Sequence, residues 1–563
     1  MLILGFLLLT LCWLPPGHYP PWLSFQSEWL AALASLCIGL GVLPRKHLAL
    51  PSLAILTGAV AIIPLAQVSL GQILFMSDGV LAAAYVLAFG LCMVAGATLA
   101  KEERGLLLDG LAAAFVAASI VSVGLVLFQW TRLGSSMYVA DTPPGARLYA
   151  NLGQPNHLST LLALGIVGLL RWYEMRRIGP VGAILGVVWL GSGQVLTQSR
   201  TAWVFIALMI LWVAFKQARV GLRTPRLAPV IAGLLFAGAV ASLNRINQVL
   251  LLTSVDLSER LTQGTRLIHW GTLVDAIWRA PWAGYGWGQV TLAQQAAAED
   301  HPLSMEILTN SHNLFLDLLV WNGLPIGLIL SFALIVWFAR HVMSCRSLDQ
   351  WTLLASLAAV AIHALVEYPL SYAYFLLPTG LMMGALDGLD NGRARPRTVP
   401  RVAFASALFA LMGLFAWISV EYMRVEEAAR QLRFVNAGIG VDRVPTAPPP
   451  DVILLDSPAA FHRFAMTEAR PGMSVAEVDW MRRVSARYAF APSMFRFAVV
   501  AALNDRTDEA AHTLARLCKM NDPARCIEAH ETWASMSERH PQMKAVAMPP
   551  KPSTAAITPA APS

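Results

Sequence analysis

The sequence predicts an all-α polytopic membrane protein with about 13 transmembrane helices and a small helical domain near its C-terminal end. Of the 563 residues, 56% are hydrophobic and 13% are charged, and the mean hydropathy is +0.57. Soluble domains carry about 25% charged residues, so this composition excludes an ordinary soluble enzyme. The last 143 positions hold 33 of the 75 charged residues, which predicts a membrane body followed by a polar C-terminal part.

Thirteen apolar runs account for the predicted spans, because a helix needs about 20 apolar residues to cross the hydrocarbon core of a bilayer. The first run has no basic residues before it and no small-residue cleavage site after it, so we expect a retained helix rather than a signal peptide. The runs are 1–14, 28–43, 48–66, 79–100, 106–130, 156–171, 180–197, 201–215, 228–243, 313–339, 351–366, 372–386 and 402–420.

Basic residues occupy every second connection between these runs and predict the topology. By the positive-inside rule these connections are cytoplasmic, so we expect the N-terminus inside and the C-terminal part outside. The same scattered residues explain the net charge of +7, and no basic patch predicts nucleic-acid binding. The six connections carry Arg45 and Lys46; Lys101 and Arg104; Arg171, Arg176 and Arg177; Lys216, Arg219, Arg223 and Arg226; Arg340 and Arg346; Arg393, Arg395, Arg397 and Arg401.

The predicted organisation has four parts. Residues 1–420 form the transmembrane body, including an outer loop at 244–312. Residues 421–450 read as a polar helix and a Pro-rich linker, residues 451–545 as an outer helical domain, and residues 546–563 as a disordered tail rich in Pro, Ala, Ser and Thr. A connection as long as the outer loop is usually functional. The alternative is an amphipathic segment whose Trp residues anchor it at the membrane surface.

Helical periodicity in the C-terminal part predicts short paired helices. Ser474, Thr507 and Asp522 are expected to cap three of them at the N-terminus. The pairing is similar to tetratricopeptide hairpins, although no clean 34-residue repeat occurs. Cys518 and Cys526 can form a disulfide if this part lies outside the cytosol, and no Cys-x-x-Cys spacing predicts a metal site.

Polar residues gather in four clusters at the outer ends of the predicted spans. Ionisable groups at membrane depth are costly and therefore functional candidates, but almost none lie within the spans, which argues against a transporter. Each cluster has a simpler interpretation: the arginines can pair with lipid phosphate, and Gln154 or His312 can satisfy a helix end. The clusters contain Gln154, Asn156 and His157; Arg200; Arg266; and His312 and Asn313, followed across the next outer turn by Glu367 and Tyr368.

Taken together, these clusters suit group transfer from a lipid-linked pyrophosphate to a hydroxyl group. Arginine offers paired donors to a diphosphate and stays charged at any working pH. Neutral histidine can accept the proton of a hydroxyl group near pH 7. No Asp-x-Asp sequence or His/Asp cluster predicts a metal at the outer face, so we expect no metal and no cofactor.

Four segments resemble the bacterial O-antigen ligase and polymerase superfamily, and specifically its protein O-oligosaccharyltransferase (PglL-type) branch. They are GQPNHLST, SRTAW, TRLIHW and SHNLFLDLLVWNGLPIGL. The Gln-Pro-Asn segment, the Tyr of Glu-Tyr-Pro and the outer C-terminal domain favour the protein-glycosylating branch. The resemblance covers most of the body, with its most specific motifs between residues 150 and 380, and implies the all-helical, metal-independent (GT-C-like) glycosyltransferase fold.

The resemblance also implies site residues. His312 is the expected base that activates the acceptor, and Gln154 and Tyr368 are expected to complete the catalytic site. Arg200 and Arg266 are expected to contact pyrophosphate. The remaining expected substrate contacts are Asn156, His157 and Asn313, and His157 is also a rival or auxiliary base.

The implied reaction moves an oligosaccharide from undecaprenyl pyrophosphate to Ser or Thr of an exported protein such as a pilin, with inversion at the anomeric carbon. The expected location is the bacterial inner membrane, among its lipids, with the C-terminal domain in the periplasm. A ligase that joins O-antigen to lipid A core, or an O-antigen polymerase, is the nearest alternative. A lipid or solute transporter is a more distant one, because neither repeated halves nor broken helices in matching halves are evident.

Overall fold

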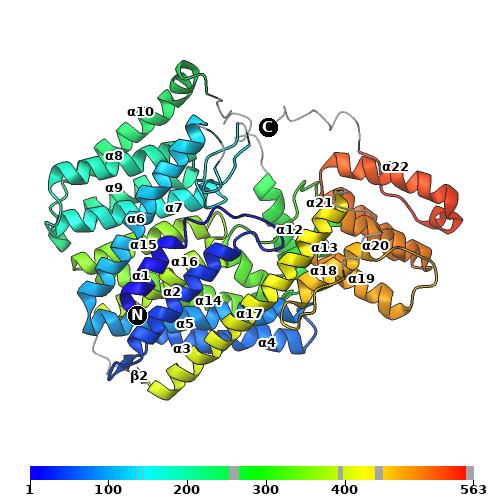
Figure 1. The fold of residues 1–563 in the computed structure, drawn as a ribbon, viewed down its shortest axis with the longest axis horizontal. Helices are drawn as coiled ribbons and strands as arrows, with labels where there is room; N and C mark the ends of the chain where they lie inside the picture. Colours follow the sequence, from blue (N-terminus) through cyan, green and yellow to red (C-terminus); the bar gives the residue numbers. More distant parts are fainter. Residues whose placement is uncertain are drawn as a thin grey trace.

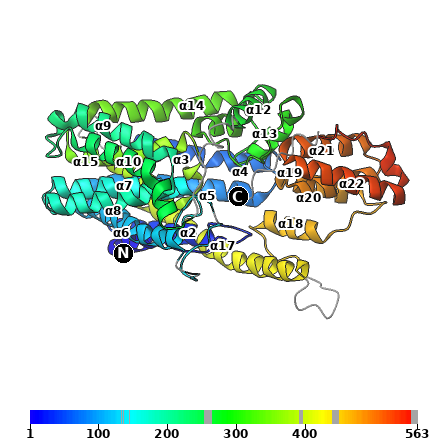
Figure 2. The ribbon, with the colours of Figure 1, turned by 90° about the horizontal axis from the view of Figure 1, so that it is seen from above.

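The protein is a bundle of long helices with a group of shorter helices beyond one end (Figure 1, Figure 2). The computed structural model describes residues 1–132, 134, 136–143, 145–252, 265–390, 397–437 and 448–552. The first ten helices are α1 (Leu2–Leu11), α2 (Phe25–Val42), α3 (Ser52–Val60), α4 (Ile62–Ser69), α5 (Met76–Glu102), α6 (Arg104–Thr131), α7 (Pro155–Glu174), α8 (Pro180–Thr197), α9 (Arg200–Val220) and α10 (Ala228–Val249).

The second half of the body contains the elements that carry most of the polar clusters. They are α12 (Thr265–Arg279), α13 (Val290–Ala297), η1 (Ala298–Asp300), α14 (Leu314–Ser344), α15 (Leu348–Ala364), η2 (Pro369–Ser371), α16 (Ala373–Leu389) and α17 (Arg401–Asn436). Two short strands, β1 (Leu48–Ala49) and β2 (Thr398–Val399), pair antiparallel with Leu48 opposite Val399.

Among the described residues, nine helical segments are long and apolar enough to cross a membrane. They correspond to α2, α3 with α4, α5, α6, α8, α9, α10, α14 and α17. The other four predicted runs are helical as α1, α7, α15 and α16. The mostly helical polytopic fold is therefore confirmed, while the count of 13 crossings stays a prediction. The predicted run 48–66 breaks after Val60, because Pro64 lacks the N–H that a continuous helix would use.

Described residues from all six basic connections lie at one end of the bundle. Arg45 forms an ion pair with Glu103 at 2.6 Å, and Arg401 donates to the Arg45 carbonyl at 2.7 Å. Arg171 and Arg104 both contact Asp349, at 2.5 and 3.1 Å. The strands β1 and β2, which lie next to Arg45 and Arg401 in the sequence, pair with each other. Lys216 donates to the Val342 carbonyl and Arg340 contacts Asp390, both at 2.6 Å. Which side of the membrane this end faces stays a prediction.

Close packing of α16 on α5 anchors the centre of the bundle. Gly380, Gly384 and Gly388 recur every four residues on α16, the spacing that lets two membrane helices approach closely. A methyl group at Gly384 would clash with the backbone of Met93, and one at Gly388 would lie 2.6 Å from the Ala97 carbonyl oxygen. The helix that follows the Glu367–Tyr368 turn is therefore fixed against α5.

Helix α14 is broken, and the glycine-rich segment of the outer loop fills the break. Gly323 has φ 72° and ψ 178° within the helix, and Pro325 supplies no N–H. Tyr285 donates its backbone N–H to the Val320 carbonyl at 2.8 Å, Gly286 donates to the Trp321 carbonyl at 3.1 Å, and Leu324 donates to the Pro281 carbonyl at 2.7 Å. The segment thus satisfies backbone groups that the break exposes, which a membrane environment requires.

The C-terminal group consists of α18 (Asp456–Met466), α19 (Val475–Arg487), α20 (Ala491–Leu503), α21 (Thr507–Met520), α22 (Pro523–Arg539) and η3 (Pro541–Ala545). Its core includes Met481, Phe497, Leu514 and Trp533. The side chains of Ser474 and Asp522 cap α19 and α22 as predicted. The prediction for Thr507 is wrong, because Arg506 holds the N-cap position and no side chain caps that helix.

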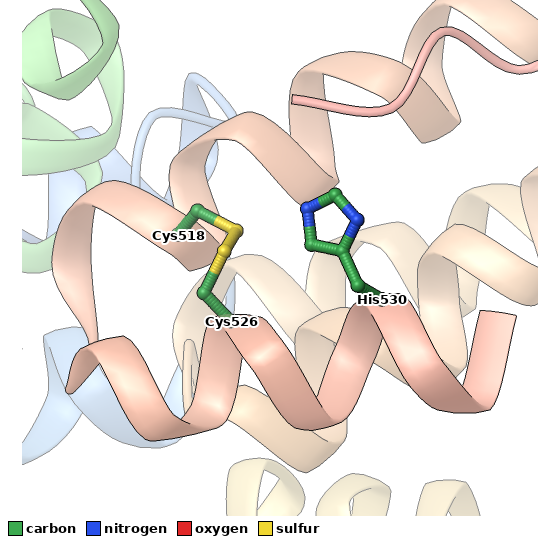
Figure 3. Close-up of side chains that lie close together, drawn as sticks. All are labelled: Cys518, Cys526 and His530. Carbon is green, nitrogen blue, oxygen red and sulfur yellow. A yellow bond between two sulfur atoms is a disulfide. The ribbon is translucent and has the colours of Figure 1, made fainter. Parts of the chain in front are cut away.

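Ion pairs and backbone contacts join this group to the body. Arg487 contacts Asp78 at 2.6 Å, and the Asp456 carboxylate accepts from the first N–H groups of α5 at 3.0 and 2.8 Å. Cys518 and Cys526 form a disulfide beside His530 (Figure 3). These three are the one group of possible metal ligands among the described residues, and the two sulfurs are bonded to each other.

Candidate functional site

The predicted site residues are carried by helix ends on the side of the bundle opposite the basic connections. Gln154 holds the N-cap position of α7, and Arg200 is the first residue of α9. Arg266 lies in the first turn of α12, and His312 precedes α14 by two residues. Tyr368 lies in the turn between α15 and η2. Residues from five separate segments thus lie at one end of the bundle.

A buried carboxylate, Glu367, connects four of these residues. Its Oε2 lies 2.7 Å from Nδ1 of His312, and its Oε1 accepts from Nη2 of Arg266 at 2.6 Å. The same Oε1 accepts from the amide of Asn156 at 3.3 Å, and the Gln154 side chain lies close enough to help lower the pKa of the carboxyl group. The Glu367 side chain is 7% exposed, whereas that of Arg266 is 47% exposed. The carboxylate therefore forms the inner layer of the site and the guanidinium its open face.

Glu367 lies next to the fourth polar cluster in the sequence, but the sequence predicts no role for it in the site. The sequence shows it in the outer turn beside Tyr368, an acid directly after an apolar run. An acidic residue there is a weak signal, because it can equally be solvated. Its burial and its partners identify it in the structure.

His312 has an uncommon backbone conformation, and contacts with Glu367 and Tyr368 orient its ring. Its φ is 58°, which is rare for a residue other than glycine and concentrates at functional sites. The ring packs edge-on against Tyr368 with centroids 5.0 Å apart. A carboxylate at Nδ1 favours the neutral tautomer with its lone pair on Nε2. Among the described residues none hydrogen-bonds Nε2, and the side chain is 18% exposed. Nε2 can therefore receive a proton from a ligand.

Asn313 positions His312 by its hydrogen bonds. Its side-chain oxygen caps α14 by accepting from the N–H groups of Phe315 and Leu316 at 3.1 and 3.2 Å. Its amide nitrogen donates to the Leu365 carbonyl at 3.0 Å. The residue thus ties the start of α14 to the end of α15, two residues before Glu367. The simpler interpretation that His312 itself caps this helix is wrong.

Neighbouring charges set the ionisation of the carboxylate. Burial alone would raise the pKa of Glu367, but the hydrogen bond from His312, the charge of Arg266 and the nearby Gln154 amide together lower it. The Glu367 carboxylate is therefore ionised near neutral pH. Burial first, and then the charge of Glu367, raise the pKa of Tyr368, so this phenol keeps its proton.

Asn156 links the carboxylate to the turn between α8 and α9. Its side-chain oxygen accepts from the Ser199 hydroxyl at 2.6 Å and from Arg147 at 3.3 Å. Ser199 also caps α9, whose first residue, Arg200, is exposed. Arg147, which sequence reasoning did not select, donates a second hydrogen bond to the Thr197 carbonyl at 3.1 Å. Arg200 and the carboxylate layer are thus held in one connected framework.

His157 lies apart from this layer, inside the bundle. It is 3% exposed, and its Nδ1 lies 3.2 Å from the Tyr374 hydroxyl. Its ring packs against those of Tyr372, at 4.8 Å, and His363, at 5.3 Å. This placement suits support of the aromatic cluster behind Tyr368. The structure does not bring His157 to the exposed side of the site.

Three family models match the chain. Residues 148–172 match the model for protein glycosylation ligase, residues 185–332 that for O-antigen ligase, and residues 351–522 that for the C-terminal part of virulence factor membrane-bound polymerase. The chain is 32% identical to a general O-oligosaccharyltransferase of Acinetobacter baylyi over 415 residues, which are 71% of this chain and 72% of the relative. It is 29% identical to a ComP-specific O-oligosaccharyltransferase of the same organism over 325 residues, 57% of this chain and 59% of that relative.

Proposed function

Because the chain belongs to the bacterial protein O-oligosaccharyltransferase (PglL-type) family and is therefore a glycosyltransferase, we propose that it moves an oligosaccharide from undecaprenyl pyrophosphate to Ser or Thr hydroxyl groups of exported proteins. The observation that carries the proposal is the Glu367–His312 pair. It leaves Nε2 open at an exposed face that also carries Arg266.

In the proposed reaction the acceptor oxygen attacks the anomeric carbon of the donor sugar while Nε2 of His312 takes its proton. The bond between that carbon and the pyrophosphate oxygen breaks, and polyprenyl pyrophosphate leaves. Arg200 and the exposed side of Arg266 stabilise the negative charge of the leaving group. A positioned base of this kind typically contributes about 10²–10⁴ in rate. A single displacement inverts the anomeric centre.

Glu367 and the remaining predicted site residues support His312 and the two arginines in the proposal. Glu367 holds the histidine tautomer, and Gln154 and Asn156 hold the carboxylate. Tyr368 limits rotation of the His312 ring, and Asn313 fixes the start of α14. The site lies opposite the basic connections, so in this proposal we assign it to the periplasmic face of the inner membrane and the basic connections to the cytoplasmic face.

The test compares wild type with His312→Ala in liposomes that contain an undecaprenyl-pyrophosphate glycan and a pilin as acceptor. The expected result is a glycan-sized increase in acceptor mass that the variant lacks. His47→Ala is the matched control, because His47 is an exposed histidine on the basic side of the bundle. The linkage is expected to be inverted relative to the donor, and a retained linkage contradicts the single displacement.

The alternatives give different products in the same assay. Transfer to lipid A core, or lengthening of the glycan on its own carrier, with an unmodified protein acceptor identifies a ligase or polymerase. A donor that stays intact with every acceptor contradicts the enzymatic proposal as a whole.

A further inference from the structure

A narrow apolar cavity lies between α2, α5, α16 and α17, away from the residues assigned above. Helix α17 runs beside α2 in both views (Figure 1, Figure 2). The cavity measures about 120 Å³, roughly ten times the 10–15 Å³ that a single water molecule requires. Its walls are mainly aliphatic and aromatic, with Ala32, Leu36, Ala88, Leu377, Leu408 and Phe415 among them. It has room for an apolar ligand.

The cavity is elongated along the helices. On α2 the lining residues run from Phe25 to Gly39, and on α17 from Leu408 to Ser419. At 1.5 Å per residue these stretches are about 21 and 17 Å long. The hydrocarbon core of a bilayer is about 30 Å thick. The cavity thus follows more than half the depth of the membrane, a shape that fits an extended chain.

The charges of the lining indicate which part of a lipid it can hold. Among the lining residues none is Lys or Arg, and Glu28 is the one acidic residue. Glu28 is buried and accepts from Nε1 of Trp22 at 3.0 Å, from the Ala373 N–H at 3.4 Å, and from the hydroxyls of Ser24 and Tyr85. A phosphate group would meet an acid and no cation there. The cavity therefore fits an uncharged chain whose charged head group lies elsewhere.

A row of aromatic rings connects the cavity with the candidate site. Ala373 lines the cavity and directly follows Tyr372. The Tyr372 ring stacks on that of Tyr368 with centroids 6.0 Å apart, and the Tyr368 ring lies 5.0 Å from that of His312. The outer end of the cavity is thus two aromatic side chains away from the proposed base. A long chain can occupy the cavity while its head group reaches the site.

We propose that this cavity binds the polyprenyl chain of the lipid-linked donor while the pyrophosphate lies at Arg200 and Arg266. The inference rests on the proposed function and assigns the chain a place in the protein. A phospholipid fits less well, because its phosphate is close to its acyl chains and would have to lie near Glu28. A polyprenyl chain is long enough to separate the cavity from the cationic site.

The test fills the cavity and varies the donor chain. Ala88→Trp places an indole in the cavity wall, and Ala214→Trp is the matched control on the exposed side of α9. Each enzyme is assayed with the same glycan on undecaprenyl pyrophosphate and on geranyl pyrophosphate. Wild type and Ala214→Trp are expected to have the lower KM for the long chain. Ala88→Trp is expected to raise that KM about tenfold and to keep the wild-type rate on the short chain. A larger increase in KM is not expected, because a polyprenyl chain that leaves the cavity enters lipid that is equally apolar.

The outcomes separate this proposal from the proposed function. The cavity assignment is overturned if wild type transfers glycan equally well from the long-chain and short-chain donors. It is also overturned if Ala88→Trp prefers the long-chain donor as strongly as wild type does. Both results leave the proposed function intact. No transfer from either donor contradicts the function itself.

If Ala88→Trp is inactive with both donors, wild type is photolabelled with a diazirine-bearing polyprenyl pyrophosphate. Labelled peptides from α2 and α17, protected by unlabelled polyprenyl pyrophosphate, support the assignment. Labelling elsewhere, or protection by phospholipid alone, overturns it, and the second result identifies a phospholipid site.

Discussion

Replacing Glu367 by Gln tests whether the buried carboxylate organises the site. The substitution keeps the size of the side chain and removes its charge. Gln can still accept one hydrogen bond from His312 or Arg266, but it cannot offer two anionic oxygens to both. The two contacts concerned are 2.7 Å to Nδ1 of His312 and 2.6 Å to Nη2 of Arg266.

The expected loss follows from these two contacts. A hydrogen bond to a charged group contributes about 1.5–3 kcal/mol, and a neutral one about 0.5–1.5 kcal/mol. Loss of charge at both contacts of Glu367 therefore costs about 2–3 kcal/mol in the organised site. Because about 1.4 kcal/mol corresponds to a factor of ten, kcat/KM is expected to fall by about 30- to 150-fold. Glu367→Ala should fall further, toward the activity of His312→Ala, because no side chain then orients the imidazole.

The assay is initial-rate transfer to the protein acceptor, followed by intact mass at several donor concentrations. Glu306→Gln is the control, because Glu306 is a carboxylate of the same outer region whose side chain is 57% exposed. If Glu367→Gln keeps the kcat/KM of wild type while His312→Ala is inactive, the proposed role of the carboxylate is refuted. Equal losses in Glu306→Gln and Glu367→Gln would point to a general effect of charge removal.

Three further perturbations test stability. Gly323→Ala puts a Cβ 2.6 Å from the Trp282 carbonyl carbon at a residue with φ 72°, so we expect its free energy of unfolding in detergent to fall by about 2–4 kcal/mol. Gly413→Ala is the control and should melt like wild type, because the space around Gly413 is open. Equal melting temperatures of the two variants would contradict the account of the break in α14. Cys518→Ser removes a disulfide between residues 8 apart in the sequence, and by the chain-entropy relation the free energy of unfolding should fall by about 2.5 kcal/mol. A reductant should lower the melting temperature of wild type but not that of the variant. If the reductant changes neither melting temperature, the disulfide does not stabilise the fold. The pKa of Glu367 is lowered in the folded protein, so the stability that its charge contributes is complete above the unfolded pKa of about 4.5 and is lost as pH falls through the folded pKa. The difference in melting temperature between wild type and Glu367→Gln should therefore be constant above about pH 5 and shrink below pH 4.5. A difference that grows on acidification would contradict a lowered pKa.

Features set by local composition could be predicted from the sequence. Apolar runs of about 20 residues, separated by basic connections, determined the helical body because the bilayer imposes both requirements. Helix starts at Ser474 and Asp522 followed from side chains that can accept from a free N–H. The prediction for Thr507 failed because α21 begins one residue earlier than expected, so that Arg506 holds the N-cap position and Thr507 is already inside the helix.

Breaks within apolar runs were harder to predict. The predicted run 313–339 looks like one apolar helix in the sequence, and Gly323 with Pro325 marks only a point where it could bend. Whether such a point kinks depends on partners for the exposed carbonyls, and these come from residues 285 and 286 in the outer loop. That loop was expected to be functional or interfacial. Its contacts show that it also completes the fold of α14, and α12 and α13 form within it.

The site shows that the sequence can indicate single functional residues without indicating which of them form hydrogen bonds or ion pairs with one another. His312 and Arg266 were selected because each has chemistry suited to a hydroxyl group or a pyrophosphate, and Gln154 was selected from the family resemblance. Glu367 has no such chemistry toward an anionic substrate, and alone it would repel one. Its role exists only through partners 55, 101 and 211 residues away, His312, Arg266 and Asn156. The Glu367 carboxylate contacts both the proposed base, His312, and the cation Arg266. A change at Glu367 should therefore affect acceptor activation and donor binding together, whereas a change at Arg200 should affect donor binding alone.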